Sequence, residues 1–296
     1  RGKVVLLVDN ALVAPLVGEL ARLEQDLVGD GWTVLRHDVP RQASTATSAT
    51  VGEVQAIKDI INADYNADSN NVKCVFIVGN VACPLWRTSG NKAHNRSEDA
   101  TYGQPNVAWT TVPDQYYVPV KGPSFKLGVG RVNMVPWGAG TFAPLNEVEL
   151  MRRYLNKDHA FRHRRTAFPT RAVEDGDIQF GNSGTLLTLP TLVGRDRVEN
   201  PRFQSLSETA ALFDGGSGYF YEMGISPERF AANNYQCVFG MQASEHGDNS
   251  SGSAAPASGG AYLVYFERGP GGGGDNARVY NHWMALGETV GACQQL

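Results

Sequence analysis

A short apolar run at residues 74–79 constrains the fold more than any other part of this chain. It follows Lys73, it is rich in β-branched side chains, and Gly79 and Asn80 close it. The run is far shorter than the roughly 20 residues that span a bilayer. Its composition is typical of a strand buried on both faces in a parallel sheet covered by helices. Such sheets gather ligands and catalytic groups beyond the carboxyl ends of their strands.

Similar patterns surround this run. Residues 3–9 and 32–38 read as further buried strands, and residues 11–29 and 51–65 read as amphipathic helices. The alternation predicts a parallel sheet with helices on its faces. Pro15 is assigned to the first turn of the 11–29 helix, where a missing N–H costs little. The helix residues expected to be buried are Leu16, Leu20, Leu23, Ile57, Ile60 and Ile61.

The rest of the chain repeats this alternation. Strands are predicted at 115–120, 126–132, 171–175, 218–222, 235–241 and 261–266, and helices at 144–161, 205–213, 226–232 and 279–291. The fold class is therefore α/β, with a mostly parallel sheet flanked by helices. We expect two domains, 1–163 and 164–296, because the helix at 144–161 is followed by a new series of strands.

Composition excludes two classes of partner. The 296 residues carry 30 acidic and 26 basic side chains, a net charge of −4. A nucleic-acid binder usually shows a basic stripe instead. No apolar run is long enough for a membrane span. The sequence begins at Arg1 rather than Met, which favours a processed secreted chain or a domain cut from a longer one.

Two thiols are candidates for nucleophilic catalysis, which needs a thiol held beside a base. Cys237 lies on a predicted strand, and His246 follows in the loop beyond it. The alternative thiol is Cys83, just past the central strand, with His94 eleven residues further on. The competing interpretations are a buried thiol for Cys237 and a loop cysteine or half of a disulfide for Cys83.

No cofactor motif is present. Carboxylates at predicted strand ends can bind Ca²⁺, but their spacing matches no calcium motif; they are Asp9, Asp38, Asp114, Glu174 and Asp175. His159 and His163 stand four residues apart on the 144–161 helix and its end. They lack the intervening acid of a zinc-protease motif, so we interpret them as histidines favoured by the negative end of the helix.

Five segments, in this order, resemble one family. They are residues 76–81, 113–117, 127–133, 147–159 and the tail at 282–289. Together they resemble the gingipain-like cysteine peptidases (peptidase family C25), and in particular a branch found in large secreted bacterial proteins. The resemblance implies two side-by-side subdomains, the second similar to caspases.

The resemblance also implies a catalytic dyad, with a histidine in a Gly-His-Gly turn after one strand and a cysteine after the next. Here the segment from Tyr235 to Cys237 is assigned to the position of the histidine turn, and His246 with Gly247 is a displaced version of it. The segment from Phe266 to Gly269, where the family keeps its nucleophile, contains no cysteine.

The resulting prediction is a C25 peptidase-like domain of a secreted or cell-surface protein. Its dyad is degenerate, and it serves as a structural or binding module beside other domains or copies in a larger extracellular assembly. The alternative is an active cysteine endopeptidase with an atypical pair, Cys237 with His246 or Cys83 with His94.

Overall fold

The structure is a computed structural model. It describes residues 1–42, 51–82, 120–121, 124–125, 127–135, 146–165, 169–174, 189–199, 219–223, 237–243, 262–268, 284 and 286. The chain divides into two compact units, Arg1–Val135 with Val290–Leu296, and Pro136–Thr289. The sequence placed the boundary at residue 163. The second unit instead begins at Pro136 and so includes helix α4 (Glu147–Arg162), while Val290–Leu296 belong to the first unit.

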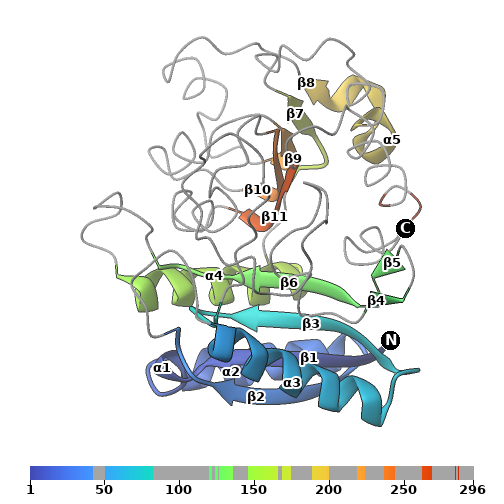
Figure 1. Cartoon of the computed structure of the whole chain (residues 1–296). Helices are drawn as coiled ribbons and strands as arrows, with labels where there is room; N and C mark the ends of the chain where they lie inside the picture. The colour runs from blue at the N-terminus through green and yellow to red at the C-terminus, as the bar shows by residue number, and fades with distance from the viewer. Residues whose placement is uncertain are drawn as a thin grey trace, which may run out of the picture. The chain divides into compact units, whose positions relative to one another are not determined.

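A four-stranded parallel sheet forms the first unit (Figure 1). Its strands are β1 (Gly2–Asp9), β2 (Trp32–Val39), β3 (Val72–Val78) and β6 (Gly128–Val132), in the order β2-β1-β3-β6. β1 pairs in parallel with both β2 and β3, and β6 pairs in parallel with β3. This confirms the predicted parallel arrangement, and the strand predicted at 126–132 is the edge strand of the sheet.

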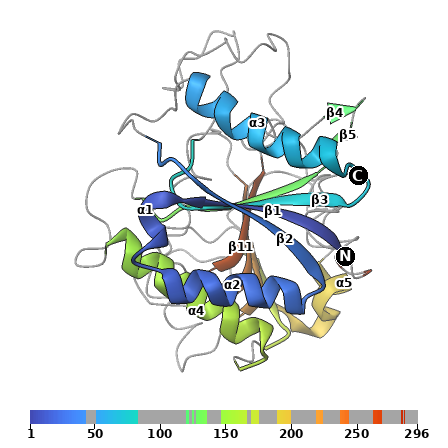
Figure 2. The ribbon, with the colours of Figure 1, turned by 90° about the horizontal axis from the view of Figure 1, so that it is seen from below.

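Helices α2 (Val17–Gly29) and α3 (Val51–Ala67) cover opposite faces of this sheet (Figure 2). On the α3 face one buried cluster joins helix and strands; its members include Val54, Ile57, Ile61, Val5, Leu7, Val75 and Ile77. Of the helix residues expected in the core, five are at most 2% exposed: Leu16, Leu20, Leu23, Ile57 and Ile61. Ile60 is only half-buried at the margin of the cluster, whereas the sequence predicted that it would be buried.

The helix predicted at 11–29 is broken near Pro15. A separate short helix, α1 (Asn10–Val13), precedes α2, and residues 14–16 form a turn between them. A proline inside a helix lacks the N–H for the ladder, and its ring clashes with the carbonyl four residues earlier. Pro15 therefore ends the first helix instead of belonging to a first turn.

A small antiparallel pair precedes β6. It joins β4 (Val120–Lys121) to β5 (Ser124–Phe125). The strand predicted at 115–120 otherwise lies outside the described residues.

The second unit contains a five-stranded parallel sheet. Its strands are β7 (Ala172–Glu174), β8 (Val198–Glu199), β9 (Tyr219–Met223), β10 (Cys237–Ala243) and β11 (Tyr262–Arg268), in the order β8-β7-β9-β10-β11. All four pairings are parallel. Four of these strands were predicted within a few residues; β8, only two residues long, was not. The helices predicted at 205–213, 226–232 and most of 279–291 lie outside the described residues.

Helix α5 (Leu189–Val193) and a 3₁₀ turn (Arg195–Arg197) connect β7 to β8. Ala172, Leu189 and Val193 form a buried cluster, against which Phe239 of β10 packs. Helix α4 contacts β11. Asn146 caps α4 by accepting the N–H of Glu149, and the Glu149 carboxylate accepts the N–H of Asn146 in return. This capping box explains why the helix begins where it does.

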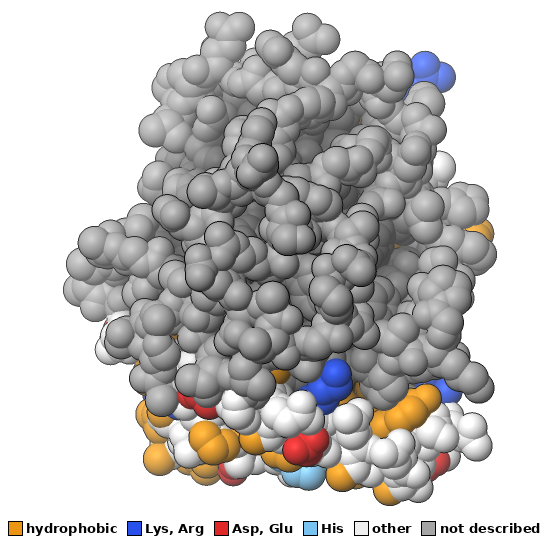
Figure 3. Space-filling view, in the orientation of Figure 1, with side chains coloured by type: hydrophobic (Ala, Val, Ile, Leu, Met, Phe, Trp, Pro, Cys, Tyr) orange, Lys and Arg blue, Asp and Glu red, His pale blue; other side chains and the backbone are white. Residues whose placement is uncertain are grey.

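Charges of both signs are mixed on one face of the described part of the chain. On the face drawn in Figure 3, the coloured acidic and basic side chains of the described residues are interspersed rather than gathered by sign. Among the helices that the structure describes, none is long and apolar enough to cross a membrane.

Replacing Leu20 by Ala should lower the free energy of unfolding by about 2–5 kcal/mol, because the side chain is fully buried and leaves a cavity. Urea unfolding followed by circular dichroism measures the change. Val28→Ala on the same helix is the control, since Val28 is 58% exposed and should change stability by less than about 0.5 kcal/mol. Equal effects of the two variants would show that the buried face of α2 is assigned incorrectly.

Candidate functional site

The Asp9 carboxylate joins three strand exits at the carboxyl edge of the first sheet. Asp9 is the last residue of β1, and its side chain is fully buried. Oδ1 accepts the N–H of Ala11 at 2.9 Å, which caps helix α1. Oδ2 accepts the N–H of Asn80 at 3.1 Å and the Arg41 guanidinium at 2.8 Å. The buried charge is thus paired and its oxygens are used by the protein itself.

Gly79 lets this carboxylate approach the end of β3. Its φ is +92°, a conformation that side chains rarely adopt. A Cβ at this position would lie 2.6 Å from Asp9 Cβ and 2.7 Å from Leu12 Cδ1. The glycine is therefore required both by its backbone conformation and by its contact with Asp9.

Further hydrogen bonds fix the chain after β3. Asn133, just past β6, donates from Nδ2 to Asn80 Oδ1 at 3.2 Å, and both residues are buried. The Arg131 guanidinium donates to the carbonyls of Val81 (2.7 Å) and Ala82 (3.1 Å). The carboxyl edge that the sequence marked as a possible ligand site is, in its described part, closed by structural hydrogen bonds. Cys83 and His94 lie outside the described residues.

Cys237, the first of the two candidate thiols, lies at the amino end of its strand, opposite to the end at which such sheets gather catalytic groups. It is the first residue of β10, and it pairs in register with Tyr219 and Tyr262, the first residues of β9 and β11. It is fully buried, and its thiol donates to the carbonyl of Phe239 at 3.1 Å. The assignment of the segment ending at Cys237 to the histidine turn is therefore wrong, because that turn follows the carboxyl end of a strand.

Lys157 of α4 provides the charged neighbour of Cys237. Burial lowers the pKa of the Lys157 ammonium to about 7, whereas Cys237 and Asp158 act in the opposite direction and favour the charged form. The ammonium also lies 5.9 Å from the centre of the Tyr154 ring. A cation beside a thiol favours the thiolate in general, so Lys157 is a potential activating group that the sequence did not reveal.

Other expected residues have less bearing on chemistry. Cys74 of β3 is half-buried, and burial raises the pKa of its thiol to about 12, which suits an inert structural cysteine. His246 follows β10 by three residues and lies outside the described part of the chain. Three residues that hold the carboxyl edge of the first sheet belong to no local sequence motif: Arg41, Arg131 and Asn133. The sequence indicates them only through the polar residues that follow three neighbouring strands.

Comparisons with known proteins agree with this architecture. The structure is similar to the crystal structure of the Arg-specific cysteine proteinase gingipain R, with a TM-score of 0.58 and 11% identity over 99% of this chain and 71% of that one. A second solved structure, described as a protease, matches with a TM-score of 0.50 and 13% identity over 81% of this chain and 52% of that chain. No protein-family profile matches the sequence, and no curated protein matches it.

These findings define the class of protein. The chain is an α/β protein with two parallel sheets flanked by helices, and it has the fold of the gingipain-like cysteine peptidases. At this low identity the likeness establishes the fold, while residue roles have to come from the chain itself.

Gly79→Ala should lower the free energy of unfolding by about 2–5 kcal/mol. The left-handed backbone conformation costs an alanine about 1–2 kcal/mol, and the overlap of its Cβ with Asp9 and Leu12 costs about 1–3 kcal/mol. Gly18→Ala is the matched control, because Gly18 lies in helix α2 and an added Cβ would meet no atom within 4 Å beyond its chain neighbours and the adjacent helix backbone. It should be neutral or stabilise by up to about 1 kcal/mol. Chemical unfolding of both variants measures the contrast, and an unaffected Gly79→Ala would contradict the role given to the Asp9 contact.

Proposed function

We propose that this chain is a peptidase-like domain whose catalytic dyad has degenerated, and that it serves as a structural or binding module of a secreted or cell-surface protein. The observation that carries the proposal is the position of Cys237. It is buried at the amino edge of three neighbouring parallel strands, whereas catalytic groups in such sheets gather at the carboxyl edge.

Strand length supports this proposal. β10 runs from Cys237 to Ala243, and a rise of about 3.3 Å per residue separates the two Cα atoms by about 20 Å. His246 comes only three residues after Ala243. A base there has to turn back along the whole strand in order to come within the roughly 3 Å that general-base catalysis requires. Burial of Cys237 also leaves no access for a peptide bond.

The sequence after β11 supports it further. The resemblance to gingipain-like peptidases implies a nucleophile directly after this strand, and Arg268 and Gly269 stand there instead. The next cysteine is Cys293, 25 residues past the end of β11 at Arg268. His246 comes three residues after the end of β10, the strand next to β11, and so follows the family's order of histidine first and cysteine second. The cysteine that would complete this order after β11 is missing from the sequence.

The second candidate function is an active cysteine endopeptidase. One observation favours it, namely the electrostatic interaction of Lys157 with Cys237, because a neighbouring cation stabilises a thiolate. An ammonium cannot take the proton of the thiol while it is charged, and full burial of Cys237 opposes ionisation. We therefore favour the module, with other domains or copies of a larger extracellular assembly as its partners.

The purified chain should hydrolyse no Arg- or Lys-containing peptide and should resist labelling by a thiol-directed peptidyl probe under native conditions. Mass spectrometry of the labelled chain identifies the modified cysteine. Cys237→Ala and Cys83→Ala should leave the labelling pattern unchanged. Cys74 is the internal reference, because its raised pKa keeps a half-buried thiol unreactive near neutral pH, and unfolding in urea should expose Cys74 and Cys237 to the probe.

Specific labelling that one cysteine variant abolishes, together with turnover of the peptide, would establish the peptidase function instead. If turnover were lost in Cys83→Ala alone, the nucleophile would be Cys83. If it were lost in Cys237→Ala, a Lys157→Met variant would test whether the ammonium supports the thiolate.

A further inference from the structure

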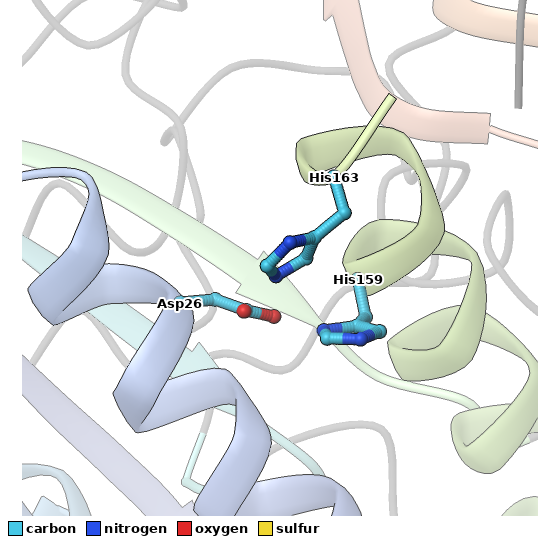
Figure 4. A group of neighbouring side chains, drawn as sticks. All are labelled: Asp26, His159 and His163. Atoms are coloured by element: carbon cyan, nitrogen blue, oxygen red, sulfur yellow. The ribbon is translucent and has the colours of Figure 1, made fainter. Parts of the chain in front are cut away.

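The last turn of α4 carries two imidazoles in a fixed relation. His159 lies in the final helical turn and His163 is the C-cap residue, and the N–H of His163 donates to the carbonyl of His159 at 3.1 Å. Residues four apart on a helix project from the same face. The two rings accordingly stand together, with their centres 4.3 Å apart and their planes inclined by 50° (Figure 4).

A well-defined helix end keeps the pair in place. The N–H of Arg165 donates to the carbonyl of Ala160 at 2.8 Å, and the N–H of Arg164 donates to that of Phe161 at 2.9 Å. With Arg164 at a φ of +53°, these bonds make a Schellman motif, the usual way in which a helix is stopped by a left-handed residue. A non-glycine residue in this left-handed conformation costs about 1–2 kcal/mol. The two hydrogen bonds of the motif offset this backbone strain at Arg164.

The nitrogen atoms of the two rings are close enough to share one ion. A ring nitrogen of His159 and one of His163 lie within 4.8 Å of each other. A tetrahedral ion bound to both at about 2.0–2.1 Å needs them about 3.4 Å apart. His159 is half-buried and His163 is exposed, so rotation of the outer side chain can close the remaining distance without a change in the backbone.

Two electrostatic features of the helix end bear on a bound cation. Arg162, which directly precedes His163, forms an ion pair with Asp158 at 2.8 Å. The carboxyl end of a helix carries the negative end of the helix dipole, which favours positive charge within the last turn. In the sequence analysis this effect accounts for histidines at the helix end. The convergence of the two rings in the structure suits a metal ion shared between them.

We propose that His159 and His163 form a two-imidazole binding site for a transition-metal dication of the Cu²⁺, Ni²⁺ or Zn²⁺ type. Imidazole nitrogen is a ligand that these ions prefer, while Ca²⁺ and Mg²⁺ prefer oxygen. Two histidines one turn apart on a helix are also the first two ligands of the zinc-protease motif, although the intervening catalytic acid is missing here. Water completes the coordination of an ion held by two protein ligands, so the site is one for binding and local stabilisation.

This proposal does not depend on the peptidase-like function. Its residues lie in the last turn of α4 and at the C-cap of that helix, and neither of them belongs to the thiol site. Failure of the metal site would leave the degenerate-dyad proposal untouched, and an active peptidase would not establish the metal site.

Titration of the full 296-residue chain with NiCl₂ and ZnCl₂ in a calorimeter tests the proposal, with the electron paramagnetic resonance spectrum of one added equivalent of Cu²⁺ as a second readout. We expect one site per chain, a Cu²⁺ spectrum with two imidazole nitrogens, and tighter binding of Cu²⁺ than of Ni²⁺. His159→Ala and His163→Ala should each weaken Ni²⁺ binding roughly 100-fold, because either change removes the chelate. Saturating Ni²⁺ should raise the melting temperature of the unmodified chain only, since binding to the folded state stabilises it.

His37→Gln is the matched control among the six histidines of the chain. His37 lies on β2, where its Nε2 contacts Asp64 at 2.7 Å, and its replacement should leave the affinity for Ni²⁺ unchanged. Melting curves without metal establish that the His159 and His163 variants are folded. Unchanged Ni²⁺ affinity in both of these variants, or a Cu²⁺ spectrum with fewer than two imidazole nitrogens, would overturn the proposal.

Discussion

The first unit depends on one buried carboxylate. Asp9 ends β1, caps α1, accepts from the chain that leaves β3, and pairs with Arg41 beyond β2. Removing either the charge or its donors would leave a buried group without partners, which is among the more damaging changes that a protein can suffer. Gly79 is needed for the same contact, because only a residue without a Cβ allows the chain to leave β3 so close to Asp9. The edge at which related folds bind ligands is therefore used here, in its described part, to hold the sheet together.

The two sheets follow the same plan. In each sheet the second strand along the chain lies on one side of the first strand, and all later strands lie on its other side. The resulting orders are β2-β1-β3-β6 and β8-β7-β9-β10-β11. Parallel strands in this order require crossovers. In each sheet the strand order reverses between the first and third strands along the chain, which is the point where open α/β sheets place ligands. The whole architecture is similar to gingipain R and to a second protease. The same fold hosts different functions, so the decisive question is where the chemical groups lie on the strands.

That question turns on the direction of β10. A cysteine within a predicted strand can lie at either end, and a shift of a few residues in the strand's bounds reverses the conclusion. Because β10 begins at Cys237 and ends at Ala243, the thiol lies at the amino edge and His246 follows the carboxyl edge. Two groups that interact with the thiol are the Phe239 carbonyl, which belongs to β10 itself, and Lys157, which belongs to a helix far away in the sequence.

The sequence by itself determined the longer strands of both sheets, the parallel arrangement and the buried faces of α2 and α3, because these follow from apolar runs and helical periodicity that act locally; it did not reveal the two-residue strand β8. It misjudged the break at Pro15, where two local rules for proline compete, and the half-exposed Ile60 at the margin of a core. It could not place Arg41, Arg131 or Asn133 around Asp9 and Asn80, nor Lys157 beside Cys237, since these contacts join residues from distant parts of the chain. Only the tertiary structure decided them, because the sheet order and the strand bounds fix which side chains meet, and neither is a local property of the sequence.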